Sequence, residues 1–183
     1  MEMWFTLAAV VAGALLGVVL GRKPRHLPER RFRLWPLVVV GIVLQVANQA
    51  GLALVIASYV LLLGFVTANI RRAGMGVVLI GLCLNLVPIV VNSGMPVRAA
   101  ALVQVGAVDT GTDAASLHLG GKRHLERRSD RLTFLGDIIA LPAAHEVVSF
   151  GDLVLAAGLA AVAFDIVRRP RRRHSRLEPA SVS

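Results

Sequence analysis

Long uncharged apolar runs alternate with short basic segments along this chain. The first run, residues 3–20, has Thr6 as its one polar side chain, and as a helix it would extend about 27 Å, close to the thickness of a bilayer's hydrocarbon core. Uncharged stretches of similar length occupy residues 34–50, 51–70 and 75–91, and a fifth apolar stretch, residues 151–167, contains only Asp152 and Asp165 as charged residues. The pattern predicts an all-α fold, a polytopic membrane helix bundle of about five transmembrane helices.

The longest interruption of the apolar pattern is residues 92–150, which carry a charged centre and no run long enough to span. We expect this segment to form one long outer loop. The predicted bundle therefore covers residues 1–167. Residues 168–183 are strongly basic and lack apolar periodicity, which predicts a disordered cytoplasmic tail.

Composition and charge support the same interpretation. Hydrophobic residues make up 56% of the 183 residues, above the roughly 45–50% of soluble domains. The net charge of +9 gathers at the ends of apolar runs, as the positive-inside rule requires, rather than on a nucleic-acid-binding face. We therefore predict a multi-pass cell-membrane protein with its N-terminus outside and its C-terminus cytoplasmic, in contact with the lipid bilayer and not with nucleic acid.

Two features inside the runs predict contacts between helices. Gly13, Gly17 and Gly21 are four residues apart, a spacing that lets a second helix approach closely. The partner is expected to be a helix of the same bundle, with a homodimer or another membrane protein as the alternative. Asn85 lies within an apolar run and must find a polar partner on a neighbouring helix.

Three short polar clusters are expected at the outer face: residues 92–96, 135–137 and 149–152. Ser149 and Asp152 have the spacing of a helix capping box, and Asp137 has the position of a cap for a short helix from Ile138. The alternative pairs the two aspartates as general base and general acid. In that hypothesis Asp137 and Asp152 are catalytic.

The stretch LGDIIALPAAHEVVSFGDLVLAAGLAAVA, residues 135–163, resembles the end of bacterial signal peptidase II, a membrane aspartyl protease. The resemblance implies that Asp137 and Asp152 are its two aspartates, with Asn92 and Gly94 orienting substrate. A more extensive resemblance rests on NSGMPV, LGDII and SFGDLVLAAG. In these segments the chain is similar to an uncharacterised bacterial family of small polytopic proteins, domain of unknown function 5317. It implies a bacterial cell membrane and about five helices, and no activity.

Metal and cofactor chemistry have little support in the residues. His118, His124 and His145 share the outer segment with the aspartates, but they lack a helical ligand spacing, so we predict no metal and no cofactor. The single cysteine, Cys83, excludes an intrachain disulfide. The favoured function is a non-enzymatic organising or partner-binding protein. The alternatives are a signal-peptidase-II-like aspartyl hydrolase acting at the outer membrane face and a small transporter subunit, so whether the chain is an enzyme stays open.

Overall fold

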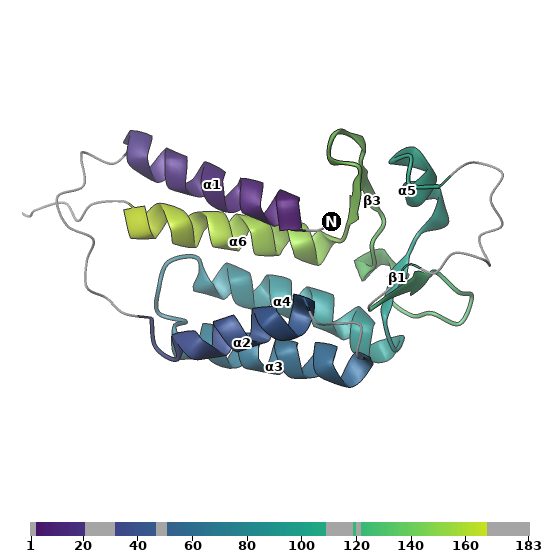
Figure 1. The fold of residues 1–183 in the computed structure, drawn as a ribbon, viewed down its shortest axis with the longest axis horizontal. Helices are drawn as coiled ribbons and strands as arrows, with labels where there is room; N and C mark the ends of the chain where they lie inside the picture. Colours follow the sequence, from purple (N-terminus) through teal and green to yellow (C-terminus); the bar gives the residue numbers. More distant parts are fainter. Residues whose placement is uncertain (1–2, 21–31, 47–50, 109–118, 120–121, 168–183) are drawn as a thin grey trace, which may run out of the picture.

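The computed structural model describes residues 3–20, 32–46, 51–108, 119 and 122–167 (Figure 1). The helices are α1 (Met3–Leu20), α2 (Trp35–Val46), α3 (Leu52–Ala68), α4 (Met75–Val91), α5 (Ala99–Gln104) and α6 (Phe150–Val167). The strands are β1 (Met95–Val97), β2 (Arg123–Leu125), β3 (Ile139–Leu141) and β4 (Glu146–Val148). Two 3₁₀ turns, η3 (Thr133–Leu135) and η4 (Pro142–Ala144), lie between strands.

The long helices pack side by side, with α6 between α1 and α4, α3 against α4, and α2 against α3 (Figure 1). The α4–α6 contact is antiparallel, because Gly74 at the start of α4 meets Val162 near the end of α6. The α1–α6 contact is parallel, because Gly13 meets Ala160 and Gly17 meets Phe164. The first and last long helices of the chain therefore run in the same direction.

Glycines make the closest helix contacts. A methyl group on Gly81 of α4 would lie 2.6 Å from the backbone nitrogen of Leu155, and one on Gly158 of α6 would lie 2.6 Å from that of Val78. Gly13 and Gly17 are likewise buried against α6. The predicted packing of these two glycines inside one bundle is therefore what the structure has. Gly21 lies outside the described residues, and the homodimer stays a prediction.

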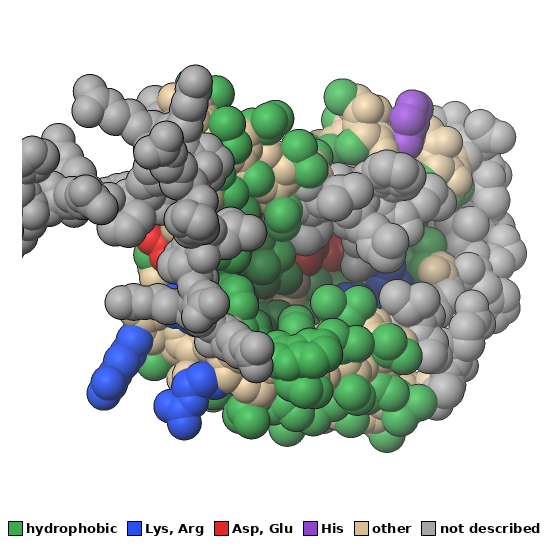
Figure 2. Space-filling view, turned by 60° about the vertical axis from the view of Figure 1, so that its left-hand side comes forward, with side chains coloured by type: hydrophobic (Ala, Val, Ile, Leu, Met, Phe, Trp, Pro, Cys, Tyr) green, Lys and Arg blue, Asp and Glu red, His purple; other side chains and the backbone are tan. Residues whose placement is uncertain are grey.

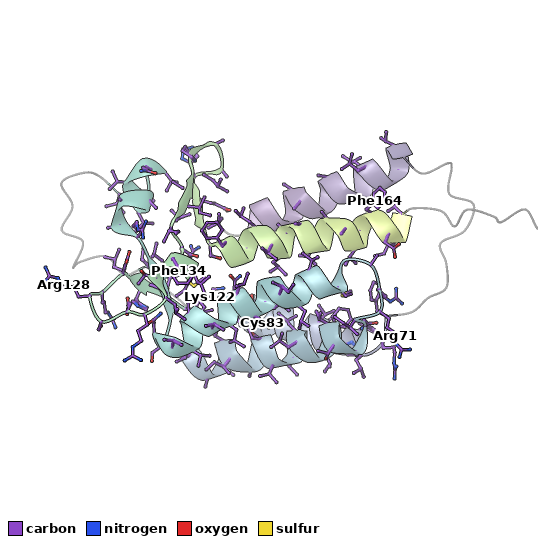
Figure 3. All side chains as sticks on the ribbon, turned by 180° about the vertical axis from the view of Figure 1, so that it is seen from behind. Arg71, Cys83, Lys122, Arg128, Phe134 and Phe164 are labelled. Carbon is purple, nitrogen blue, oxygen red and sulfur yellow. The ribbon has the colours of Figure 1, made fainter. Side chains whose placement is uncertain are left out.

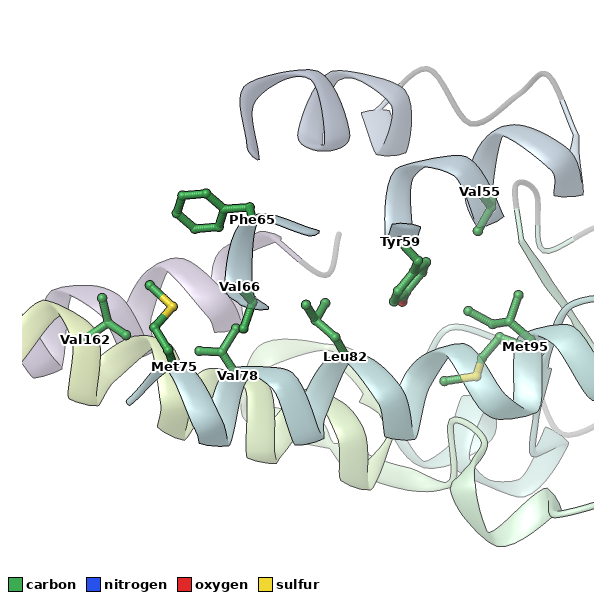
Figure 4. Close-up of a cluster of buried hydrophobic side chains, with 10 residues drawn as sticks. Val55, Tyr59, Phe65, Val66, Met75, Val78, Leu82, Met95 and Val162 are labelled. Carbon is green, nitrogen blue, oxygen red and sulfur yellow. The ribbon is translucent and has the colours of Figure 1, made fainter. Parts of the chain in front are cut away.

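The main hydrophobic core lies between α3 and α4. Val55, Tyr59 and Val66 from α3 are each only 2% exposed, and they pack with Leu82 of α4 (Figure 4). Apolar side chains at three- and four-residue spacing share one face of a helix, which explains why α3 presents this set to α4.

The described residues of 92–149, namely 92–108, 119 and 122–149, form a small folded unit, called here the loop module, at the end of the helices where α1 begins (Figure 1). Strands β1 and β2 pair in parallel with Met95 opposite Arg123, and β3 and β4 pair antiparallel with Ile139 opposite Val148. The module has its own hydrophobic core, formed by Val97, Ala101, Leu102, Val105 and Val147.

The predicted all-α bundle of about five transmembrane helices with one long outer loop is wrong in two respects. Among the described residues, α6 alone is long and apolar enough to cross a membrane; the other apolar helical stretches are 10–17 residues long. Helix α3 stops before Asn69, inside its apolar run, whereas α4 starts after the left-handed Gly74 and fills its run of 17 residues. The expected outer loop is also not a loop, because it contains four strands.

Candidate functional site

A polar network joins α4 to the start of α6. The side-chain amide of Asn85 donates a hydrogen bond to Asp152 Oδ1 at 2.6 Å. The hydroxyl of Ser149 lies 2.8 Å from both Asn85 Oδ1 and Asp152 Oδ2. Asn85 is 2% exposed and Ser149 is fully buried. The prediction that Asn85 needs a polar partner on a neighbouring helix is confirmed, because the partner is on α6.

Ser149 and Asp152 form a capping box. The backbone N–H of Asp152 donates to Ser149 Oγ at 3.0 Å, and the backbone N–H of Ser149 donates to Asp152 Oδ2 at 2.9 Å. The two residues satisfy each other's backbone donors, as the spacing predicted. Gly151 is required next to them, because any side chain there would collide with Asn85. This part of the site therefore also fixes where α6 starts.

Asp137 has a different environment. Its side chain is 1% exposed and its Oδ2 lies 2.7 Å from Arg123 Nη2 in an ion pair. Its backbone bonds to Pro96 and Arg98, which forms a bridge beside β1. The predicted short helix from Ile138 is wrong, since residues 139–141 pair as β3 instead. Asp137 therefore does not cap a helix; it places a buried negative charge against β2.

The hairpin register brings the two aspartate segments to the same edge. Because Ile139 pairs with Val148, the residues just before β3 and just after β4 lie at the open end of the hairpin. Figure 2 shows a hollow on one face of the molecule, with hydrophobic side chains around it and acidic and basic side chains at its inner end. The two carboxylates have different partners: Arg123 for Asp137, and Ser149 with Asn85 for Asp152. Their role as a catalytic pair stays a prediction.

Asn92 and Gly94 have contacts within the chain. The side chain of Asn92 donates to the backbone oxygen of Arg131 at 2.8 Å and accepts from its backbone nitrogen at 2.7 Å. Gly94 has a φ of 151°, and a side chain there would lie 2.8 Å from Nδ1 of His124. Substrate orientation by these two residues stays a prediction; the bonds of Asn92 hold the loop at Arg131 to the end of α4.

The described histidines of the module have partners other than Asp137 and Asp152. His124 Nε2 lies 3.0 Å from Asp130 Oδ2, and His145 Nδ1 lies 3.1 Å from the backbone oxygen of Val105. His118 falls outside the described residues. Within the described part of the chain, no three histidine, cysteine or acidic side chains gather closely enough to hold a metal ion.

Two neighbouring basic residues make contacts that were not predicted, and one of them, Arg123, belongs to the site. Arg123 pairs with Asp137, and its Nη2 also donates to the backbone oxygen of Val147 at 3.0 Å. The amine of Lys122 lies 3.5 Å from the hydroxyl of Tyr59 and 5.7 Å from the centre of that ring. The sequence marks both as members of a charged stretch. Their partners follow from the parallel β1–β2 pairing, which links segments 28 residues apart.

Comparison with known proteins gives one match. The family model described as "Family of unknown function (DUF5317)" matches residues 29–164, which is most of the chain, so the chain belongs to this family. The family resemblance predicted from the sequence is thereby confirmed. No curated protein and no solved structure matches the chain, and the resemblance to signal peptidase II is not shown.

Proposed function

On the premise of membership in a family that carries no assigned activity, we propose that this chain is a lipid-embedded, non-enzymatic protein whose loop module binds partners. The observation that carries the proposal is the apolar outer surface of helices that contain no charge. Helices α1, α2, α3 and α4 have no Asp, Glu, Lys or Arg at any position.

Helix α2 gives the clearest case for lipid contact. Val39, Val40, Ile42 and Val43 are 47–58% exposed. At about 100° per residue these positions cover an arc of about 160° on the helix. Exposing these side chains to water costs about 25 cal/mol for each Å² of apolar surface, whereas contact between the same surface and the acyl chains of lipids has no such cost. The exposed Leu15, Leu16 and Val19 of α1 support the same environment.

The contacts of the two aspartates favour a structural role over catalysis. A general acid or base must reach a substrate proton at hydrogen-bond distance. Asp137 is 1% exposed and held by Arg123, while Asp152 accepts hydrogen bonds from Ser149 and Asn85. These partners join α4, α6 and the module. We therefore infer that the polar residues hold the module in place as a docking surface.

Hydrolysis by the aspartate pair is the second candidate function. One observation favours it: the β3–β4 hairpin brings the segments of Asp137 and Asp152 to one edge, and Figure 2 shows acidic side chains at a hollow with hydrophobic walls. A lipid-linked or membrane peptide is the substrate class that such walls would suit.

Membrane extraction tests the first part of the proposal. The full chain is produced in bacterial cells, and the membrane fraction is washed with alkaline carbonate, which removes peripheral proteins. We expect the chain to stay in the pellet and to leave it only in detergent. Release by carbonate, or a chain that stays dispersed without detergent, would contradict lipid embedding.

Separate Asp137→Asn and Asp152→Asn variants distinguish partner binding from hydrolysis. Each variant replaces the wild-type chain in cells, protein levels are matched, and membrane lipoproteins and small peptides are profiled by mass spectrometry. A non-enzymatic protein predicts the wild-type cleavage profile in both variants. Accumulation of the same uncleaved substrates in both would instead establish the hydrolase.

A further inference from the structure

The segment between β2 and η3 presents three arginines outward. This basic loop, residues 126–132, has exposed side chains at Arg127, Arg128 and Arg131. Arg128 projects at the outermost end of the module in Figure 3. These three side chains have no acidic partner within 4.0 Å among the described residues. The loop therefore offers positive charge to a ligand outside the chain.

The acidic residues of the basic loop are already engaged. Asp130 Oδ2 accepts from the backbone N–H of Arg127 at 2.7 Å and lies 3.0 Å from the ring of His124. Glu126 lies 3.4 Å from the guanidinium of Arg98. Both acidic residues thus have partners within the module, whereas the three exposed arginines have no acidic partner among the described residues.

The basic loop is also held rigidly to the helices. Asn92, the residue that ends α4, makes two hydrogen bonds to the backbone of Arg131. The next residue, Leu132, has a φ of 54°, a left-handed conformation that is uncommon for leucine. Strained backbone of this kind persists when surrounding contacts impose it, and it often occurs where a surface binds a ligand. The side chain of Leu132 is 39% exposed rather than buried in either core.

An apolar surface leads from α4 to the arginines. Val90 and Val91, at the end of α4, are 51% and 47% exposed, and Phe134, in η3 packed on α4, is 57% exposed. Figure 3 shows Phe134 nearer to the ends of the helices than Arg128, so this exposed apolar side chain lies between the helices and the outermost arginine. A bilayer has the same order of layers, from hydrocarbon to interface to phosphate.

We propose that the basic loop binds the phosphate groups of anionic phospholipids, with Leu132 and Phe134 at the boundary of the acyl chains. The inference rests on the proposed lipid embedding of the helices. Charge alone would fit an acidic protein segment equally well. The continuity with the apolar surface of α4 favours lipid, because a water-borne acidic segment has no use for exposed valine, leucine and phenylalanine beside its site.

Site-specific quenching tests the proposal with the full chain. A fluorophore is attached to Ser129→Cys in a Cys83→Ala background, and the chain is reconstituted in phosphatidylcholine vesicles. The vesicles contain a minor fraction of either spin-labelled phosphatidylglycerol or spin-labelled phosphatidylcholine. We expect phosphatidylglycerol to quench more strongly, and the Arg127→Gln/Arg128→Gln variant to reduce that preference by up to roughly thirtyfold, since each of the two basic residues contributes on the order of 1 kcal/mol near an anionic surface.

A matched control removes two exposed arginines at the other end of the helices. Arg33→Gln/Arg71→Gln changes the net charge equally and should leave the preference at position 129 unchanged. Equal quenching by both lipids in the wild-type chain would overturn the proposal. The proposal would also be overturned if the control variant lowered the preference for phosphatidylglycerol as much as the Arg127→Gln/Arg128→Gln variant does. If polyglutamate changed the fluorescence at position 129 while lipid charge had no effect, the partner would be an acidic protein segment instead. A chain that fails to float with any vesicles would instead contradict the lipid embedding itself.

Discussion

The helices and the loop module are held together by different kinds of contact. Between α4 and α6 the close contacts are backbone to backbone across Gly81 and Gly158. In the module, short strands are fastened by side-chain bonds such as the Arg123–Asp137 ion pair. The capping box of Ser149 and Asp152 lies where the two regions meet.

The difference follows from what each region has available. The uncharged helices have few polar side chains, so van der Waals contact at small residues is their means of packing. The module has strands of only three residues, too short to be stable on their own, so buried polar bonds and a small core must add to them. We therefore expect that substitutions which change side-chain volume destabilise the helices most, and that substitutions which remove a charge or a hydrogen-bonding group destabilise the module most.

The largest effect is expected at Arg123 in the module. Arg123→Gln would remove the guanidinium that lies 2.7 Å from the carboxylate of Asp137, which is 1% exposed, and loss of one partner of a buried ion pair costs about 3 kcal/mol or more. The free energy of unfolding in detergent, from denaturant titration, measures it. The control is Arg128→Gln at an exposed site. Similar unfolding of both variants would mean that the ion pair does not hold the module.

A volume change on α4 should rank next. Gly81→Val would place side-chain atoms against the backbone of Leu155, and overpacking of this kind costs about 2–3 kcal/mol. Gly76→Val, on the same helix, has no atom within 4 Å of the new Cβ and serves as the matched control. Thermal unfolding in detergent should show a lower midpoint for Gly81→Val only. Equal midpoints would remove the case for a glycine-packed helix pair.

The junction between the two regions should show an intermediate effect. Ser149→Ala removes the hydroxyl that accepts from the backbone of Asp152 and contacts Asn85, and loss of such a cap costs about 1 kcal/mol. We expect faster amide hydrogen exchange in the first turn of α6, measured by mass spectrometry. Ser93→Ala, an exposed serine of the module, is the control. Unchanged exchange at residues 150–153 would contradict the role of the capping box.

The smallest effect is expected for a polar pair at the surface of the module. Arg98 and Glu126 are 3.4 Å apart, and their side chains are 46% and 31% exposed. An exposed ion pair contributes about 0.5 kcal/mol or less. Arg98→Gln should therefore unfold within that margin of the wild-type chain in the denaturant titration. A loss comparable to that of Arg123→Gln would show that burial is not what separates the two ion pairs.

Local features of the site were predictable, and distant pairings were not. The spacing of Ser149 and Asp152 predicted a capping box, because both partners lie within one helical turn. The position of Asn85 inside an apolar run predicted that its side-chain amide has a polar partner on another helix, but it did not identify that partner. Nothing in the residues next to Asp137 predicted β3 in place of a helix. Although β4 follows within one hairpin, a strand depends on its cross-strand and same-face neighbours, and Asp137 itself pairs with the distant Val97. The ion pair with Arg123 and the bonds between Asn92 and Arg131 were missed for the same reason.

For this protein, the sequence alone determined where apolar helices form, how α6 is capped and which family the chain belongs to. These properties depend on periodicity and on neighbours a few residues away. Tertiary structure decided how the described residues of the loop module fold. In the module, strands, ion pairs and side-chain amide bonds join residues that lie far apart in the sequence. Such pairings gain their free energy only when the whole module is assembled, so no local pattern records them.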